Sequence, residues 1–453
     1  MGTELQKRYG LITAIALVVG IVIGSGVFFK AEKILSATGG NLPLGILAWV
    51  LGGLIMISCA YSFAVMATKY EKVNGIVDYA EASLNENYGF FVGWFMAIIY
   101  YPTLTSVLAW VTARYTCVLF GWDIVGGQCM VIACFYLVLS YSVNALSPII
   151  AGKIQVTTTV IKLIPLLLMA VVGTIVGLSN GMTIENFTTV VAPVESTASA
   201  LFVAVVATAF AYEGWIIATS INAELKNAKK NLPWALLGGT FIIMIVYILY
   251  YVGLAGAVPN AVMMEGGEAG AKLAFETIFS KGAGTLIFVF IIISCFGTLN
   301  GLMLGCVRGL FSVAARGKGP KPEAFMQVDK VTNMPTNSSI AGVMLCAFWL
   351  LYFYGANLTG PWFGKFSFDT SELPIVTIYA LYIPIFFMMM KKEKDLNVFK
   401  RFIMPTIAIL GCIFMIIAAC FSHRMAVVYY LITFVVIMII GGCFMKSKSK
   451  STL

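Results

Sequence analysis

The sequence predicts an all-α membrane protein with twelve transmembrane helices. Of the 453 residues, 60% are hydrophobic and only 11% are charged, and the mean hydropathy is +0.94. A helix needs about 20 mostly apolar residues to cross the hydrocarbon core of a bilayer. Because little sequence remains outside runs of this kind, we expect a single transmembrane domain over residues 1–453. The runs lie near 9–36, 42–68, 88–119, 127–145, 154–178, 199–221, 234–257, 283–310, 338–355, 371–390, 403–421 and 425–444.

The net charge of +9 reflects membrane topology rather than nucleic-acid binding. With an inner N-terminus and twelve spans, 21 of the 29 basic residues fall on the inner side and six on the outer side, while Arg114 and Lys162 lie within spans. Lys and Arg gather on the cytoplasmic side of membrane proteins. We therefore expect both termini in the cytoplasm and a place in the cell membrane. The six outer residues are Lys30, Lys33, Lys272, Lys281, Lys365 and Arg424.

Cysteine and histidine usage gives no sign of a metal or cofactor. The ten cysteines lie mostly within spans and form no C-x-x-C pair, and His423 is the only histidine. This pattern fits neither a zinc site nor a disulfide framework. We expect no metal and no cofactor.

The first span is interrupted at its centre by "GIVIGSGVFF", residues 20–29. Each glycine costs about 1 kcal/mol of helix propensity relative to alanine, and a broken helix in lipid leaves backbone groups unpaired. One explanation is that Gly20 and Gly24 form a small-residue packing face. The other is an unwound segment over 23–27, whose free N–H groups at the positive end of the next half-helix suit an anion such as a carboxylate.

In the fifth span, Lys162 lies about nine residues from the start, roughly 14 Å into a core about 30 Å thick. A central lysine costs at least about 2.5 to 3.5 kcal/mol, which makes it a candidate functional residue. Its expected partners are freed carbonyls of the first span near Gly26 and the hydroxyl of Ser294 in the eighth span. The alternative is a lysine that snorkels to the inner surface.

The sixth span carries a second interruption, "FAYEGW", residues 210–215. Spans one and six each begin a set of five helices, and they cross in opposite directions. Breaks at corresponding places in two halves are typical of an inverted-repeat transporter with its site at the bilayer midplane. The second break therefore favours unwinding over packing at the first. The predicted repeats cover about 9–178 and about 199–390, with two extra helices over about 403–444.

Together, the two breaks predict an α-amino acid as the ligand. Free N–H groups at the first break suit a carboxylate, and free carbonyls of Phe210, Ala211 and Glu213 at the second suit an ammonium group. An α-amino acid carries both groups on one carbon. The main chain would read these two groups, while neighbouring side chains shape a pocket for the R group.

Three side chains near the second break have open roles. Glu213, the only acidic residue placed inside a span, is a buried structural carboxyl, a proton acceptor, or an acid that admits cationic substrates. Phe210 flanks the break, where it could cover the substrate as an outer gate. Tyr247 in the seventh span either packs in the core or hydrogen-bonds the unwound segment.

The motifs "GIVIGSGVFF", "FAYEGW" and "NAELKNAKKNLPWAL", in this order and spacing, resemble the amino acid-polyamine-organocation (APC) superfamily. Within it they resemble the L-type amino acid transporters, including bacterial exchangers of alanine, serine and cysteine. The resemblance covers nearly the whole chain. It implies a five-plus-five inverted-repeat core with discontinuous helices 1 and 6, plus two additional helices. It also implies sodium-independent exchange of small neutral L-amino acids, glycine included, by alternating access, and no enzyme activity.

The resemblance also assigns roles to matching positions. It implies that backbone amides at the first break bind the substrate carboxylate and that backbone carbonyls at both breaks accept from the α-ammonium. Lys162 matches a family lysine that takes the place of the sodium ion used by sodium-coupled relatives. Ser294 matches its partner, and Tyr247 supports the site from a second position. The amides are those of Ser25, Gly26 and Val27, and the carbonyls those of Ile23, Phe210, Ala211 and Glu213.

The sequence departs from the family pattern in three respects, of which the one at Ala228 concerns only the stiffness of a loop. Glu213 stands where several relatives have glycine, which leaves strict neutrality of the substrate open. Ala228 replaces a proline of the following loop. Cys117 and Cys129 lie where animal members carry the cysteine that binds a heavy subunit, but neither is a convincing equivalent, so we expect a single-chain transporter.

Alternative functions differ in what they require. A proton-coupled amino acid symporter is the first rival, because some members of the superfamily use the lysine at this place in a proton-responsive way. An exchanger that also accepts cationic amino acids is another. A channel would need a filter of like residues, usually from symmetric copies, and a membrane enzyme would need paired acids or histidines at one depth. The sequence displays neither pattern.

Overall fold

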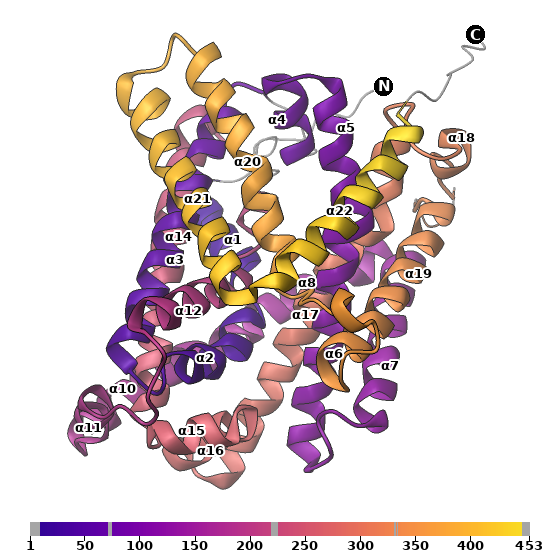
Figure 1. The fold of residues 1–453 in the computed structure, drawn as a ribbon. Helices are drawn as coiled ribbons and strands as arrows, with labels where there is room; N and C mark the ends of the chain where they lie inside the picture. Colours follow the sequence, from indigo (N-terminus) through magenta and orange to yellow (C-terminus); the bar gives the residue numbers. More distant parts are fainter. Residues whose placement is uncertain (1–9, 71–74, 219–224, 330–331, 333, 446–453) are drawn as a thin grey trace. The chain divides into compact units, whose positions relative to one another are not determined.

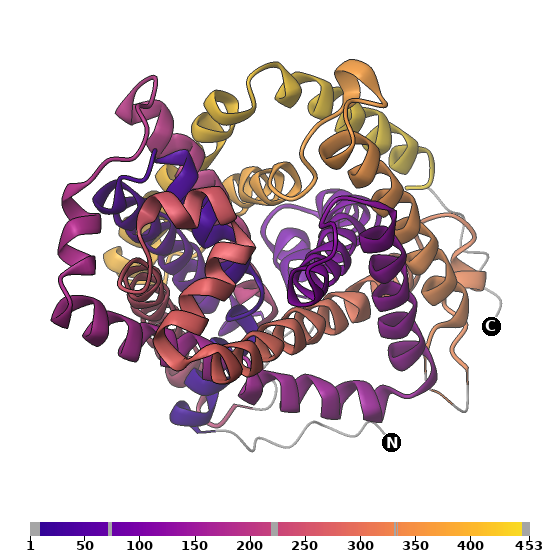
Figure 2. The same cartoon turned by 90° about the horizontal axis from the view of Figure 1, so that it is seen from below.

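The structure is a computed structural model that describes residues 10–70, 75–218, 225–329, 332 and 334–445. The regular elements of this part of the chain are all helices, which confirms the all-α membrane class. Figure 2, a view from below, shows them as coiled ribbons. Among the described residues, ten helices are long and apolar enough to cross a membrane, and two shorter apolar helices, Leu11–Gly20 and Thr197–Ala211, belong to the predicted first and sixth spans. Twelve spans and the inverted repeat stay predictions.

Some sequence-based expectations fall outside the described residues. The cytoplasmic placement of the termini concerns residues 1–9 and 446–453, and the loop motif "NAELKNAKKNLPWAL" includes residues 222–224. The orientation of the termini therefore stays a prediction. The rest of the loop motif begins α14, which runs from Ala228 to Ala255.

The chain divides into two compact units, and each takes segments from both predicted repeats. Unit 1 comprises residues 1–79, 159–291 and 375–422, and unit 2 comprises 80–158, 292–374 and 423–453. Helices that contribute residues to both units are α4 (Ile76–Ser83), α8 (Pro148–Ile161), α17 (Lys281–Ala314) and, by one or two terminal residues, α20 (Leu373–Lys392) and α21 (Met404–His423). The predicted repeat boundaries stay a prediction, and the candidate site is described within unit 1.

Unit 1 is built around α14, which packs along α1 and α3, while α12 packs on α2 and α3 (Figure 1). Trp49 of α3 lies at the centre with no exposed surface. Its indole stands edge-on to Tyr212 at 5.6 Å and to Tyr247 at 5.5 Å between ring centroids. The helices and short turns of this unit are α1 (Leu11–Val22), α2 (Gly26–Ala37), α3 (Leu42–Ala67), α9 (Leu163–Leu168), η2 (Met169–Gly173), α10 (Thr174–Ser179), α11 (Met182–Thr188), α12 (Thr197–Ala211), α13 (Trp215–Ala218), α15 (Asn260–Gly266), α16 (Glu268–Phe279), α20 (Leu373–Lys392), η6 (Phe399–Ile403) and α21 (Met404–His423).

Unit 2 packs α6 against α7 and α19. A buried amide pair joins α7 to α17, because the Asn144 side chain donates to the side-chain oxygen of Asn300 at 2.8 Å. The indole of Trp94 donates to the carbonyl of Ile437 at 3.0 Å and holds α22 on α5. The elements of this unit are α5 (Glu86–Phe95), η1 (Met96–Tyr100), α6 (Tyr101–Phe120), α7 (Gly127–Leu146), α18 (Pro322–Phe325), α19 (Thr336–Phe353), η4 (Tyr354–Leu358), η5 (Gly364–Phe366) and α22 (Met425–Cys443).

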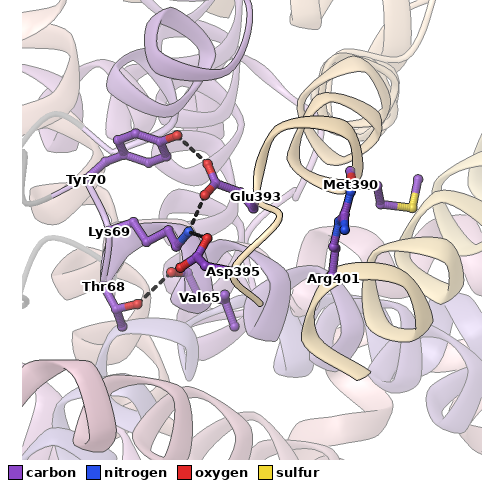
Figure 3. A network of polar contacts seen from close by, with 8 residues as sticks. All are labelled: Val65, Thr68, Lys69, Tyr70, Met390, Glu393, Asp395 and Arg401. Carbon is purple, nitrogen blue, oxygen red and sulfur yellow. Dashed lines mark hydrogen bonds and ion pairs between the residues drawn. The ribbon is translucent and has the colours of Figure 1, made fainter. Parts of the chain in front are cut away.

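A charged cluster ties the end of α3 to the segment that follows α20 within unit 1 (Figure 3). The Lys69 ammonium donates to the carboxylates of Glu393 and Asp395, and the Tyr70 hydroxyl donates to Glu393. Burial lowers the pKa of Lys69, but the bonds to Asp395 and Glu393 outweigh it and raise that pKa above its ordinary 10.5. The hydrogen bond from Lys69 lowers the pKa of Asp395 below 3.8. Burial and the contact with Glu393 raise the pKa of Tyr70 to about 12.

We expect Lys69→Met to lower the free energy of unfolding by roughly 1 to 3 kcal/mol, because it leaves the buried Glu393 carboxylate without its ammonium. Because its pKa is lowered, Asp395 stabilises the folded protein above about pH 4, and this contribution is lost as the pH falls. Because its pKa is raised, Lys69 stabilises the folded protein up to about pH 10, and this contribution is lost at higher pH. Thermal unfolding in detergent between pH 5 and 9 measures the difference, with the exposed Lys394→Met as the control. Equal unfolding temperatures for Lys69→Met and the unaltered protein would contradict this expectation.

Candidate substrate-binding site

Both predicted helix interruptions are present. Helix α1 ends at Val22, the extended residue Ile23 follows with ψ 113°, and α2 begins at Gly26. Helix α12 ends at Ala211 and α13 begins at Trp215. Between them Gly214 has φ 107°, a left-handed conformation that side chains disfavour. Both breaks lie where the sequence predicts them, but the first is shorter than predicted. It covers residues 23–25, whereas residues 26–27, predicted to be unwound, already form the start of α2.

The first break exposes backbone N–H groups at the start of α2. The first four N–H groups of a helix lack partners inside it, and the first intrahelical bond here runs from the Phe29 amide to the Ser25 carbonyl at 3.0 Å. The Ser25 hydroxyl does not cap the helix, and its buried oxygen has no hydrogen-bond partner among the described residues. The amides of Ser25, Gly26 and Val27 thus lie at the positive end of a helix, where an anion is stabilised.

The two breaks lie against each other. A Cβ added at Gly26 would stand 2.5 Å from Cα of Ala211 and 3.0 Å from the carbonyl oxygen of Phe210. Only a glycine allows this approach, because the neighbouring atoms belong to the backbone and cannot rotate away. The fold therefore brings the start of α2 to the end of α12, while the binding roles of residues 25–27 and 210–211 stay predictions.

Tyr247 of α14 contacts both breaks. Its buried hydroxyl donates to the Ala211 carbonyl at 3.1 Å and lies 3.4 Å from the carbonyl of Val22, the last residue of α1. Its ring stacks on Tyr212 at 5.2 Å between centroids. Both roles considered for Tyr247 are present: its ring packs in the core, and its hydroxyl bonds to the helix ends that border the two breaks.

Removing this hydroxyl is expected to slow about tenfold the amino acid transport that the sequence predicts. Tyr247→Phe keeps the ring but leaves the Ala211 carbonyl without its donor, so the second break is less firmly held. Initial uptake rates in reconstituted vesicles measure the effect. Tyr136→Phe is the matched control, because the Tyr136 hydroxyl contacts Thr116 within unit 2 at 3.1 Å, whereas both breaks belong to unit 1. An uptake rate within twofold of the unaltered protein for Tyr247→Phe would count against its supporting role.

Lys162 follows α8 and is 2% exposed, so its ammonium does not reach the surface by snorkelling. The ammonium donates to the carbonyl of Gly20. This carbonyl lacks an intrahelical partner, because α1 ends two residues later, and it lies at the negative end of the helix. The expectation of a carbonyl near Gly26 is wrong in detail. The lysine binds the end of the first half-helix rather than the start of the second.

Ser294 is buried in α17, and its hydroxyl has no hydrogen-bond partner among the described residues. It belongs to unit 2, whereas Lys162 belongs to unit 1. The predicted pairing of Ser294 with Lys162 stays a prediction.

The Phe210 ring, 8% exposed, is covered by two residues of α2. The Phe29 ring stands edge-on to it at 5.8 Å, and the Lys30 ammonium lies 5.1 Å from its centroid. The charge distribution predicts an outer-side position for Lys30 and assigns it no role, but the residue is fully buried in α2. The signal that could have found it is its position four residues after Gly26, on the same helix face.

Glu213 lies in the second break and is half-buried. It interacts electrostatically with the hydroxyls of Tyr379 and Tyr382 on α20 and with the thiol of Cys59 on α3. Its structural, proton-accepting and cation-admitting roles stay open. In the part of the chain that the structure describes, no group of three or more His, Cys, Asp or Glu side chains could hold a metal.

The known proteins to which this chain is similar are amino acid transporters and exchangers. A model of the amino acid permease family matches residues 9–443. The serine/threonine exchanger SteT of Bacillus subtilis is 31% identical over 420 residues, which cover 91% of each chain. The b(0,+)-type amino acid transporter 1 of Homo sapiens is 24% identical over 82% of this chain and 79% of its own. The large neutral amino acids transporter small subunit 2 of Homo sapiens is 26% identical over 74% of this chain and 62% of its own.

Proposed function

The chain belongs to the amino acid permease family of the APC superfamily, and from this premise we propose that it is a sodium-independent exchanger of small neutral L-amino acids. It is an integral membrane amino acid transporter. Alanine, serine, cysteine and glycine are the proposed substrates. We place it in the plasma membrane as a single chain without a heavy subunit, with both termini in the cytoplasm.

The observation that carries the proposal is the contact between Gly26 and the backbone of Ala211. It sets unpaired amides beside helix-terminal carbonyls, so a ligand with a carboxylate and an ammonium on one carbon can satisfy both. The amides of Ser25, Gly26 and Val27 bind the carboxylate. The ammonium donates to carbonyls at both breaks, namely those of Ile23, Phe210, Ala211 and Glu213. Main-chain recognition of this kind reads the amino acid backbone and leaves the R group to the surrounding side chains.

The buried ammonium of Lys162 supports transport without a coupling cation. It supplies a fixed positive charge to the Gly20 carbonyl at the end of α1, where a coupling cation would otherwise stabilise the unwound helix. Because no cation has to bind or leave, the loaded carrier alternates between the two sides of the membrane. The empty carrier returns slowly, and each transported amino acid is exchanged for another.

Counterflow in vesicles tests the proposal. Purified protein in proteoliposomes loaded with unlabelled L-alanine should take up external labelled L-serine in sodium-free buffer, with saturation and with preference over D-serine. Efflux of labelled alanine should require an external amino acid. Efflux at the same rate without one would overturn exchange, and accumulation driven by a pH gradient would support the proton-coupled symporter.

The open point of the substrate range is Glu213, which lies in the second break with both carboxyl oxygens buried. Competition by L-lysine against labelled L-serine separates two versions of the proposal. Weak competition is the result expected of a neutral exchanger. Competition as strong as that of L-alanine, abolished in Glu213→Gln, would identify an exchanger that also accepts cationic amino acids.

A further inference from the structure

Lys30 is a lysine with no exposed surface whose charged end lies against two aromatic rings. Its ammonium nitrogen is 5.0 Å from the centroid of Phe29 and 5.1 Å from that of Phe210. The two rings meet edge-on, with an angle of 72° between their planes. The cation thus bridges two helices, since Phe29 and Lys30 belong to α2 and Phe210 to α12.

A cation within about 6 Å of a ring centroid is attracted by the electrons of the ring face, and the attraction is strongest where both groups are shielded from water. Both conditions hold here, because Lys30 is fully buried and Phe210 is 8% exposed. Lys30 also lies one helical turn after Gly26, so both residues lie on one face of α2. The backbone contact at Gly26 and the ring contact at Lys30 therefore belong to one interface between α2 and α12, one helical turn apart.

We propose that Lys30 is a positioning residue that holds the Phe210 ring over the bound amino acid. The inference rests on the proposed function and on the role of outer gate that the sequence predicts for the Phe210 ring. The ammonium fixes the ring against α2, so the ring loses less conformational entropy when the site closes over the amino acid. Lys30 thereby sets the affinity for the external amino acid, and it does so through the ring of Phe210 without contacting the substrate.

Kinetics of Lys30 variants provide the test. Lys30→Met keeps the length of the side chain and removes its charge, so KM for external L-serine should rise about fivefold to thirtyfold, with a maximal rate within twofold. Lys30→Arg preserves a cation over the ring and should keep KM near that of the unaltered protein. Lys33→Met removes the same charge from the same helix and is the matched control, with KM within twofold.

A double-mutant comparison shows whether the effect passes through Phe210. In a Phe210→Leu background, Lys30→Met should change KM less than twofold further, because the ring that it holds is absent. A full KM increase in that background would overturn the inference. So would a fall in maximal rate with an unchanged KM in Lys30→Met, since that result indicates a structural role alone.

A second measurement leaves Lys30 in place and covers the case in which Lys30→Met does not fold. Replacing Phe210 with mono-, di- and trifluorinated phenylalanine weakens the ring's attraction for a cation stepwise at nearly constant shape. KM should rise with each fluorine, and a constant KM across the series would overturn the inference. Absence of counterflow in the unaltered protein would instead overturn the proposed function, and this inference with it.

Discussion

Gly26→Ala is expected to reduce amino acid exchange at least about 100-fold. The added methyl carbon would stand 2.5 Å from Cα of Ala211 and 3.0 Å from the Phe210 carbonyl oxygen. Because these are backbone atoms, α2 and α12 must move apart. A shift of about 1 Å in the groups that hold a reacting or transported molecule is enough to cost about 100-fold in rate. Counterflow of labelled L-serine measures the loss.

A glycine with room around it provides the control for Gly26. At Gly238 in α14, an added Cβ would approach only the flexible tip of Ile15, at 3.7 Å. Gly238→Ala should therefore transport at the normal rate and be slightly more stable, because alanine favours the helix. Counterflow by Gly26→Ala at the rate of Gly238→Ala would show that the close approach of the two breaks is not needed for transport.

Lys162→Met is expected to abolish exchange while the protein stays folded. Methionine fills a similar length, and an apolar residue in place of a buried charge is often tolerated. The Gly20 carbonyl loses its donor, however, and the end of α1 loses the positive charge beside it. We expect counterflow to fall at least about 100-fold, because the unwound segment is no longer fixed.

The exposed Lys153 on α8 is the matched control for this charge removal. Lys153→Met should transport normally. Size-exclusion profiles and unfolding temperatures in detergent establish that both variants are folded. A Lys162→Met protein that keeps more than half of the normal counterflow would remove this lysine from the transport mechanism.

The helix breaks could be predicted from sequence because the cause is local. Glycines and a serine in the first span, and Glu213 with Gly214 in the sixth, disfavour a helix wherever the rest of the fold places them. The start of a helix frees amides and the end of a helix frees carbonyls, so the position of each break also predicts which groups are free. Much of the candidate site follows from this, because the ligand is expected to bind the main chain.

The partner of Lys162 could not be predicted in detail. The sequence predicts the depth of the lysine in its span, but the choice between Gly20 and Gly26 depends on how far α1 is shifted along the segment after α8. That offset is set by packing between distant segments. Lys30 was missed for a similar reason, since its ring partner Phe210 comes from another helix and its burial depends on that contact.

The most direct test of the main-chain clamp is competition by analogues that lack one of the two recognised groups. Labelled L-alanine uptake into loaded proteoliposomes is measured against unlabelled L-alanine, propionate, ethylamine and L-alanine methyl ester. We expect only L-alanine to compete, because each analogue leaves the amides that begin α2 or the carbonyls that end α12 without a partner. Competition by propionate or ethylamine at the concentration at which L-alanine competes would contradict recognition of an amino acid by the two helix breaks.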